Sequence, residues 1–246
     1  MLSGRVVARV VLVASFAWMC LPWPTTVLAQ GVGLRLAAGR MLVAVEGLPD
    51  PNFAETVVLL TQYNEEGALG LILNQRSELS LSRVLRKLPA AKDRVDPVYL
   101  GGPVERTAVL ALLRSKAKPE DSLPVFGEVY MVSSRPMLEK TLESHIKANQ
   151  FHVYLGYAGW GPGQLDREVR LGSWHVMPGE AAAVFDPEPE SLWARVVARA
   201  ELKIALLGSP FHPAVLPKPE FFACRDDFRR CDQHSAISFQ LLVTSP

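Results

Sequence analysis

The glycine-rich stretch at residues 156–163 is the part of the sequence whose residue types and spacing best suit ligand binding. It follows a predicted strand and leads into a predicted helix, where backbone N–H groups and the helix dipole can hold an anion. The spacing differs from the dinucleotide fingerprint, and no suitable acidic residue follows in a second βαβ unit. The glycines could instead permit positive φ angles while the two aromatic side chains pack inward. The candidate binding residues are Gly156, Tyr157, Gly159, Trp160, Gly161, Gly163 and Gln164.

A second glycine turn, Gly101-Gly102-Pro103, follows the predicted strand at 98–100 and reverses the chain sharply. Ligand binding and a role in the fold are again the two interpretations, and a role in the fold is favoured more strongly here than at residues 156–163. Gly101 and Gly102 are therefore the weaker binding candidates.

The remaining polar residues offer little for catalysis. The sequence contains no nucleophile elbow, no P-loop and no His-Glu-x-x-His motif. Ser134 fits a helix cap, and the pair Glu65-Glu66 fits a solvated hairpin turn. Each histidine is more simply a surface or core residue than a catalyst. We predict no catalytic residue, no metal site and no cofactor; the histidines are His145, His152, His175, His212 and His234.

Residues 1–29 have the pattern of a cleavable export signal. The first nine residues carry two arginines and no acid, and residues 10–21 are almost wholly apolar. This run is shorter than the about 20 residues that span a bilayer. Val27 and Ala29 are the small residues that a signal peptidase accepts, so cleavage would leave Gln30 first. We expect a periplasmic or secreted protein without a stable membrane span; an uncleaved inner-membrane anchor and a cytoplasmic protein are the alternatives.

Charge argues against two classes of partner. The chain has a net charge of +1, and removal of a leader with two arginines and no acid leaves −1. A net charge this close to zero does not indicate the excess of positive charge that binding to nucleic acid or to an anionic membrane surface would require.

The end of the chain differs in composition. Four prolines, at 210, 213, 217 and 219, exclude a regular helix or a central strand there. We therefore divide the chain into a leader (1–29), a domain (30–208) and a C-terminal extension (209–246) that ends in a possible edge strand at 237–243.

Cys224 and Cys231 are the cysteines left after Cys20 is removed with the leader. An oxidising compartment favours a disulfide between them, which would contribute about 2–3 kcal/mol. Free thiols and a zinc site with the nearby histidines are the alternatives, although the spacing matches no common zinc pattern.

Strand-like and helix-like patterns interleave along the domain, which favours a mixed α/β fold. The expected strands are 41–45, 56–63, 68–74, 98–100, 108–113, 128–132, 151–155, 174–177 and 182–185. The expected helices are 81–88, 136–149, a short one from 164, and 190–207.

Five blocks, in order, resemble the AlgH/YqgE family over about residues 35–208. They are GRMLVA at 39–44, DPNF with TVV at 50–58, NEEGALGLILN at 64–74, YLGGPV at 99–104 and LGYAGWGPGQL at 155–165. The resemblance implies a three-layer α/β/α sandwich with a smaller α/β plait-like lobe. It implies no particular chemistry, although some members carry a transcriptional-regulator label.

These observations favour an exported, non-catalytic protein with a binding, accessory or regulatory role in the cell envelope. Its partner would be an envelope protein or a small ligand, and not nucleic acid. A hydrolase-like enzyme with an unfamiliar site is the first alternative. A DNA-binding regulator is the second, but the charge balance and the lack of a basic helix-turn-helix oppose it.

Overall fold

The computed structural model describes residues 35–206. The predicted leader and the C-terminal extension, with Cys224, Cys231, His212 and His234, lie outside the described residues, so their predictions stay untested. Among the helices of residues 35–206, none has the length and apolar character needed to cross a membrane.

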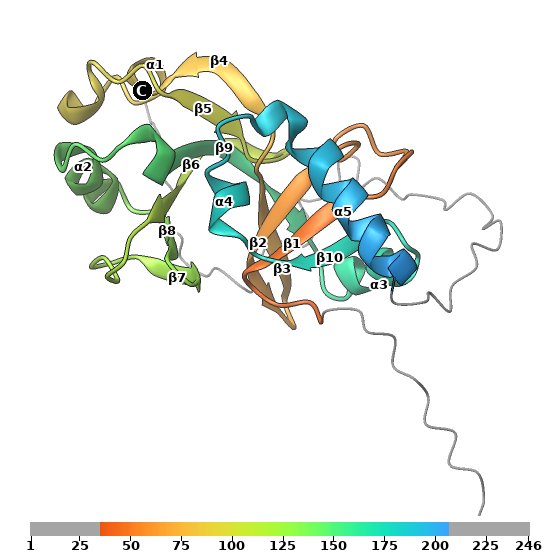
Figure 1. Ribbon diagram of the computed structural model, residues 1–246. Helices are drawn as coiled ribbons and strands as arrows, with labels where there is room; N and C mark the ends of the chain where they lie inside the picture. Colours follow the sequence, from red (N-terminus) through yellow and green to blue (C-terminus); the bar gives the residue numbers. More distant parts are fainter. Residues whose placement is uncertain (1–34, 207–246) are drawn as a thin grey trace, which may run out of the picture. The chain divides into compact units, whose positions relative to one another are not determined.

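Ten strands of the described region form one curled sheet (Figure 1). Eight of them follow the order β10-β1-β2-β3-β9-β6-β8-β7, while β4 pairs with β5 and β5 with β9. The strands are β1 (Arg40–Ala44), β2 (Val57–Asn64), β3 (Gly67–Ile72), β4 (Arg76–Ser80), β5 (Pro97–Leu100), β6 (Val104–Arg114), β7 (Leu123–Phe126), β8 (Val129–Val132), β9 (Phe151–Trp160) and β10 (Trp174–Pro178).

Strand β9 joins the two halves of the sheet. Its residues 158–160 pair with β3, and its residues 153–155 pair in parallel with β5 along the same edge. Strand β6 occupies the opposite edge over residues 151–157. Because β9 is paired along both edges, its position determines where β3, β5 and β6 lie.

Three hydrophobic cores lie against the sheet, each covered by a helix. The helices and 3-10 turns are α1 (Leu81–Val84), η1 (Pro89–Ala91), α2 (Arg135–Glu143), η2 (Ala148–Gln150), α3 (Gln164–Arg170), α4 (Ala181–Val184), η3 (Pro189–Ser191) and α5 (Leu192–Leu206). The α5 core includes Leu59, Leu112, Tyr154, Phe185 and Val196; the α2 core includes Leu81, Val98, Leu138 and Val153; the α3 core includes Leu42, Leu60, Trp160 and Leu165.

The predicted three-layer α/β/α sandwich with a plait-like lobe is wrong. Such a fold needs parallel strands joined by helices that cover both sheet faces. Within residues 35–206, β5 and β9 form the one parallel pair, and β2–β3 and β7–β8 are hairpins. Helices α1 and α4 have four residues each, too short to serve as crossover helices. The structure is a curled, mainly antiparallel sheet with few helices.

Most predicted elements are present, with informative exceptions. The predicted strand at 182–185 is wrong, because these residues belong largely to helix α4. The predicted helix at 136–149 ends at Glu143. Ser134 does precede helix α2, but its side chain makes no capping hydrogen bond.

Gly156 changes the face to which the side chains of β9 point. Tyr154 lies in the α5 core and Tyr157 packs against the same core, although strict alternation would place them on opposite faces. Gly156 makes this possible with a φ of +68°, and the pairing with β6 shifts register beside it. In this shift residues 105–108 of β6 lie opposite Gly156, so the extra residues belong to β6; we call this irregularity the Gly156 bulge.

The two glycine segments singled out in the sequence meet at this bulge. A Cβ added at Gly101 would lie 2.3 Å from the carbonyl oxygen of Gly156, and one at Gly102 2.2 Å from the carbonyl carbon of Tyr157. A Cβ at Gly156 would lie 2.7 Å from the carbonyl oxygens of Gly102 and Val104. The backbones therefore touch directly, and no side chain fits between them.

Gly156→Ala should destabilise the fold by at least about 2 kcal/mol, since it adds both left-handed strain and backbone overlap. Gly163→Ala is the matched control: its φ is +66° but its Cβ would meet open space, so about 1 kcal/mol is expected. Gly159→Ala, in the same strand with its nearest contact at 3.5 Å, should change stability by under about 1 kcal/mol. Urea unfolding of the full chain measures all three. Equal losses for Gly156→Ala and Gly163→Ala would show that the close approach is unimportant.

Candidate functional site

The glycine stretch at 156–163 is mostly strand, not loop. Gly156, Tyr157, Gly159 and Trp160 lie within β9, and residues 161–163 alone link it to helix α3. Gly163 is the N-cap of α3 with a left-handed backbone, and Gln164 is the first helical residue. The structure brings Gly101 and Gly102 to Gly156, but as touching backbones and not as the walls of a pocket.

The link between β9 and α3 satisfies its own polar groups. The Gly161 N–H donates to the Gln164 side-chain oxygen at 3.1 Å, and the Gln164 amide donates to Glu168 at 3.0 Å. The Glu168 carboxylate also accepts from the indole N–H groups of Trp160 and Trp174, each at 2.9 Å. The Gly161 N–H is thus already in use and is not free to hold an anion, which favours a structural role for the link.

The aromatic side chains beside this link leave no space for a ligand. Phe53 stacks on Trp160 with ring centroids 5.7 Å apart and meets Trp174 edge-on at 5.6 Å. Both tryptophans are almost completely buried. The three rings form a packed cluster in the α3 core and not an open cage for a cation.

A cleft of about 400 Å³ lies elsewhere, between strands β4 and β5, the start of β9 and the segment after α4. This volume is in the range of small-molecule sites. Its lining includes Arg76, Tyr99, Arg114, His152, Phe185 and Asp186. We treat it as the candidate functional site.

A stack of three rings forms the inner wall of the cleft. The His152 imidazole stacks on Tyr99 with centroids 4.5 Å apart, and Phe185 meets it edge-on at 5.1 Å. His152 is 9% exposed, yet its Nδ1 atom has no hydrogen-bond partner among residues 35–206. The same holds for the buried hydroxyl of Tyr154, whose ring lies 5.5 Å from that of Tyr99. Unpaired buried polar groups are rare and costly, and they often mark sites of function.

The inner wall carries no charge at neutral pH. Burial lowers the pKa of His152 to about 4, and the Val184 backbone raises it only in part. Burial raises the pKa of Tyr99, although Arg76 opposes this effect, and it raises that of Tyr154 well above its ordinary value. The wall therefore presents the neutral imidazole of His152 and the neutral phenol of Tyr99, while the neutral Tyr154 lies buried beside Tyr99.

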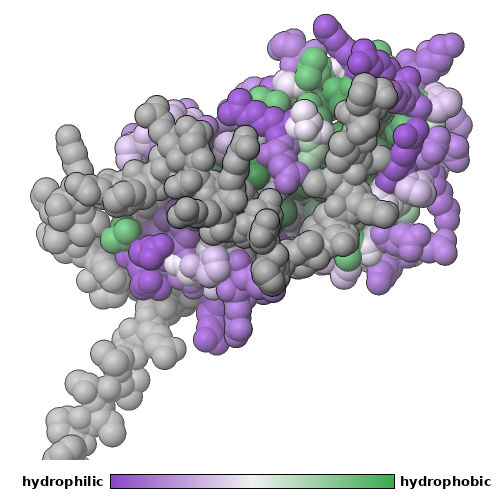
Figure 2. Space-filling view, turned by 180° about the vertical axis from the view of Figure 1, so that it is seen from behind, coloured by the Kyte–Doolittle hydropathy of each residue, from purple (hydrophilic) through white to green (hydrophobic). Residues whose placement is uncertain are grey.

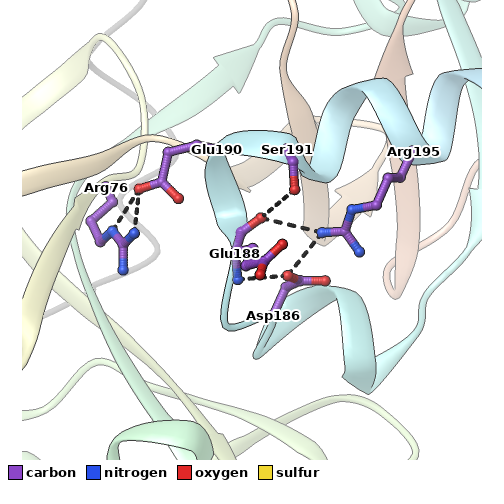
Figure 3. A network of polar contacts seen from close by, with 6 residues as sticks. All are labelled: Arg76, Asp186, Glu188, Glu190, Ser191 and Arg195. Carbon is purple, nitrogen blue, oxygen red and sulfur yellow. Dashed lines mark hydrogen bonds and ion pairs between the residues drawn. The ribbon is translucent and has the colours of Figure 1, made fainter.

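Charged residues surround the wall, and each is held by an ion pair. Arg76 of β4 binds Glu190 of η3, with Nη2 to Oε1 at 2.5 Å, and Asp186 binds Arg195 of α5 at 2.9 Å (Figure 3). The Glu188 carbonyl accepts from Ser191 at 3.1 Å and from Arg195 at 3.2 Å, which closes this network. The other two charged lining residues are also paired: Asp96 with Arg94 and Arg114 with Glu128.

This arrangement suits binding better than catalysis. A histidine with a pKa of about 4 is a weak base at neutral pH, and no carboxylate of the described residues accepts a hydrogen bond from it to orient it. The acids of the cleft already have arginine partners. In the described part of the chain, no three His, Cys, Asp or Glu side chains come together as a metal site would require.

Sequence reasoning missed this cleft because its residues come from five separate segments of the chain. One signal was present: His152 and Tyr154 alternate with Phe151 and Val153, so polar atoms occur on one face of a strand that is otherwise apolar. Because residues 182–185 were wrongly predicted to form a strand, no sequence pattern placed Phe185 beside His152. His175 lies in β10 and is half-buried, and His145 is exposed just after α2.

Comparison with known proteins agrees with the sequence blocks. Residues 41–205 match a family described as AlgH-like. The chain belongs to the AlgH-like family. It is 34% identical over 172 residues to a UPF0301 protein of Thioalkalivibrio sulfidiphilus, covering 69% of this chain and 92% of the relative. It is 35% identical over 174 residues to a UPF0301 protein of Streptomyces avermitilis, covering 70% and 90%. The predicted resemblance is confirmed.

Two solved structures resemble the AlgH-like domain. The solution structure of AlgH from Pseudomonas aeruginosa has a TM-score of 0.56 and 32% identity, covering 72% of this chain and 95% of that one. The crystal structure of DIP2367 from Corynebacterium diphtheriae has a TM-score of 0.58 at 24% identity, covering 68% and 88%, and supports the fold alone.

The buried His152 should make the AlgH-like domain sensitive to acid. The His152 imidazole takes up a proton near pH 6.5 in the unfolded chain and only near pH 4 in the folded chain. Above pH 6.5 the imidazole is neutral in both states, so its titration does not affect the free energy of unfolding there. As pH falls from 6.5 to about 4, the free energy of unfolding should decrease by up to about 3 kcal/mol. His152→Phe keeps a ring on Tyr99 and removes the titration, so it should flatten the dependence measured by urea unfolding.

His175→Phe is the matched comparison, because burial lowers the pKa of His175 as well, with Glu201 opposing the effect. His175→Phe should reduce the pH dependence of the free energy of unfolding less than His152→Phe does. A slope that His152→Phe leaves unchanged would contradict the assignment of a neutral, buried imidazole.

Proposed function

We propose that this AlgH-like protein is an exported, non-catalytic binding protein of the cell envelope, and that the His152 cleft binds a small ligand. The observation that carries the proposal is the cleft itself, with a neutral ring stack as its wall and an imidazole nitrogen without a partner. Ligand pockets are mainly apolar or aromatic, with a few polar groups that set orientation.

The ion pairs at the rim of the cleft support a preformed binding site. Arg76 and Asp186 reach opposite partners in the segment from η3 to α5, so the network of Figure 3 links that segment to β4. Residues held in this way lose little conformational entropy when a ligand arrives. A neutral ligand with an aromatic or heteroaromatic ring fits such a wall, because each rim charge already has a counterion.

The surface chemistry supports the exclusion of nucleic acid. Six arginine or lysine side chains of the described region are neutralised by carboxylates in ion pairs, namely Arg76, Arg94, Arg114, Lys140, Arg195 and Arg199. Hydrophilic residues border small hydrophobic patches on the face in Figure 2. Binding to phosphates needs a dense face of unpaired cations.

Small heteroaromatic probes test the cleft. Titration of the ¹⁵N-labelled full chain with indole, nicotinamide and adenine should shift amide resonances of Tyr99, His152 and Phe185. Ala182 is an exposed lining residue of α4, so Ala182→Trp should fill the cleft mouth and weaken binding at least about tenfold. Leu171→Trp, at an exposed position outside the lining, is the control. Absence of any shift, or shifts that Ala182→Trp does not reduce, would reject the cleft as a ligand site.

Export is tested separately. A fusion of residues 1–40 to a reporter active only in the periplasm should give signal, and the mature protein should begin at Gln30. Ala29→Asp should block cleavage because signal peptidase requires a small residue there, while Gln30→Glu should not. A mature start at Met1 would indicate an anchor, and signal confined to the cytoplasm would contradict export.

A further inference from the structure

The outer edge of β10 is an unprotected edge in the described part of the sheet. Strand β10 pairs with β1 over five consecutive residues, from Arg40↔Pro178 to Ala44↔Trp174, without a register shift. Its other edge has no strand partner among residues 35–206. A flat strand of this kind presents unpaired N–H and C=O groups that attract another strand.

The other two outer strands carry the features that prevent such pairing. Strand β7 contains Pro124, and its register with β8 is irregular. Strand β4 contains the charged residues Arg76 and Glu78, and its register with β5 is irregular too. Strand β10 (Trp-His-Val-Met-Pro) has no acid, lysine, arginine or bulge, and its proline is the last residue. Charges, prolines and bulges are the usual protection of edges, so β10 is the strand that needs a cover.

We propose that residues 237–243 of this chain add to the free edge of β10 as a further strand. Ile237, Phe239 and Leu241 alternate with Ser238 and Gln240, the period-two pattern of a strand with one buried face. The segment contains no proline, glycine or charged residue, unlike the prolines at 210–219. It therefore has the composition that a strand beside β10 requires.

The described domain ends beside this edge. Helix α5 packs on β1 and β10, and Glu201, in its C-terminal half, acts electrostatically on His175 of β10. Thirty residues separate Leu206 from Ile237, and an extended chain covers about 3.3 Å per residue. The segment can thus reach the edge without strain. It also lies beyond residues 41–205, so the added strand would be a feature of this chain in addition to the AlgH-like domain.

Hydrogen exchange of the full chain tests the proposal. N–H groups alternate between the two edges of a strand, so either Ser238→Pro or Phe239→Pro must remove a donor that faces β10. At least one of them should raise the exchange rate of the outward-facing amides among Trp174–Met177 about tenfold or more. Ser235→Pro, outside the segment, should leave these rates unchanged, and amides of β7 should not respond to any variant.

The controls separate the possible occupants. Phe239→Lys keeps its backbone donor and should raise the same rates less, which guards against a proline that merely unfolds the chain. Wild-type β10 amides that already exchange freely, or variants that leave them unchanged, would overturn the proposal. Protection that grows with protein concentration, together with a dimer in sedimentation, would assign the edge to a second copy and also overturn it.

Discussion

The contact between the Gly101–Gly102 turn and the Gly156 bulge is the constraint on which the rest of the domain depends. Two backbones approach until no Cβ fits between them, and this happens where β5 and β6 both reach β9. Ile72 and Gly101 add backbone hydrogen bonds there: the Ile72 N–H donates to Gly101, and the Gly101 N–H donates to Leu155. The bulge then lets one strand serve three cores, since its side chains change face at Gly156. Each half of the sheet is thereby fixed relative to the other.

The same bulge determines the character of the cleft. Before Gly156, the alternation of β9 places His152 and Tyr154 on the side of the α5 core, where Phe185 and Tyr99 enclose the imidazole. Burial in that environment favours the neutral form and lowers the pKa of His152. Charge is kept to the rim, where arginines hold each carboxylate. Strand β9 thus supplies the imidazole of the neutral wall, while the charged rim comes from β4, the end of β6 and the residues before β5 and after α4.

Local patterns predicted most of the strands, but not how they are joined. The hairpin at 56–74 and the long last helix have local signals, namely a turn between two strands and a helical periodicity. The direction of pairing has no such signal: the interleaved pattern indicated a mixed α/β fold, and the three-layer α/β/α sandwich that the family resemblance implied is wrong. Helix α4 shows the limit of periodicity: the apolar run Ala-Ala-Ala-Val fits a buried strand or a short helix equally well. The glycine segments around 101 and 156 lie together in the structure, yet a sequence cannot tell a glycine that admits a ligand from one that admits another backbone.

Polar satisfaction separates the two candidate sites. Around Gly161, the Gly161 N–H donates to Gln164, and Glu168 accepts hydrogen bonds from the N–H groups of Gln164, Trp160 and Trp174. Such closed networks make a fold rigid and specific. The cleft differs from the link. Its charged rim residues are all in ion pairs, but His152 Nδ1 and the nearby Tyr154 hydroxyl have no hydrogen-bond partner among the described residues. Among residues 35–206, the buried side-chain polar atoms without a hydrogen-bond partner belong to His152 in the wall of the cleft and to Tyr154, whose ring lies 5.5 Å from that of Tyr99. A ligand-binding function is therefore better sought at the ring stack, whose residues are far apart in sequence, than at the glycine motif of residues 156–163.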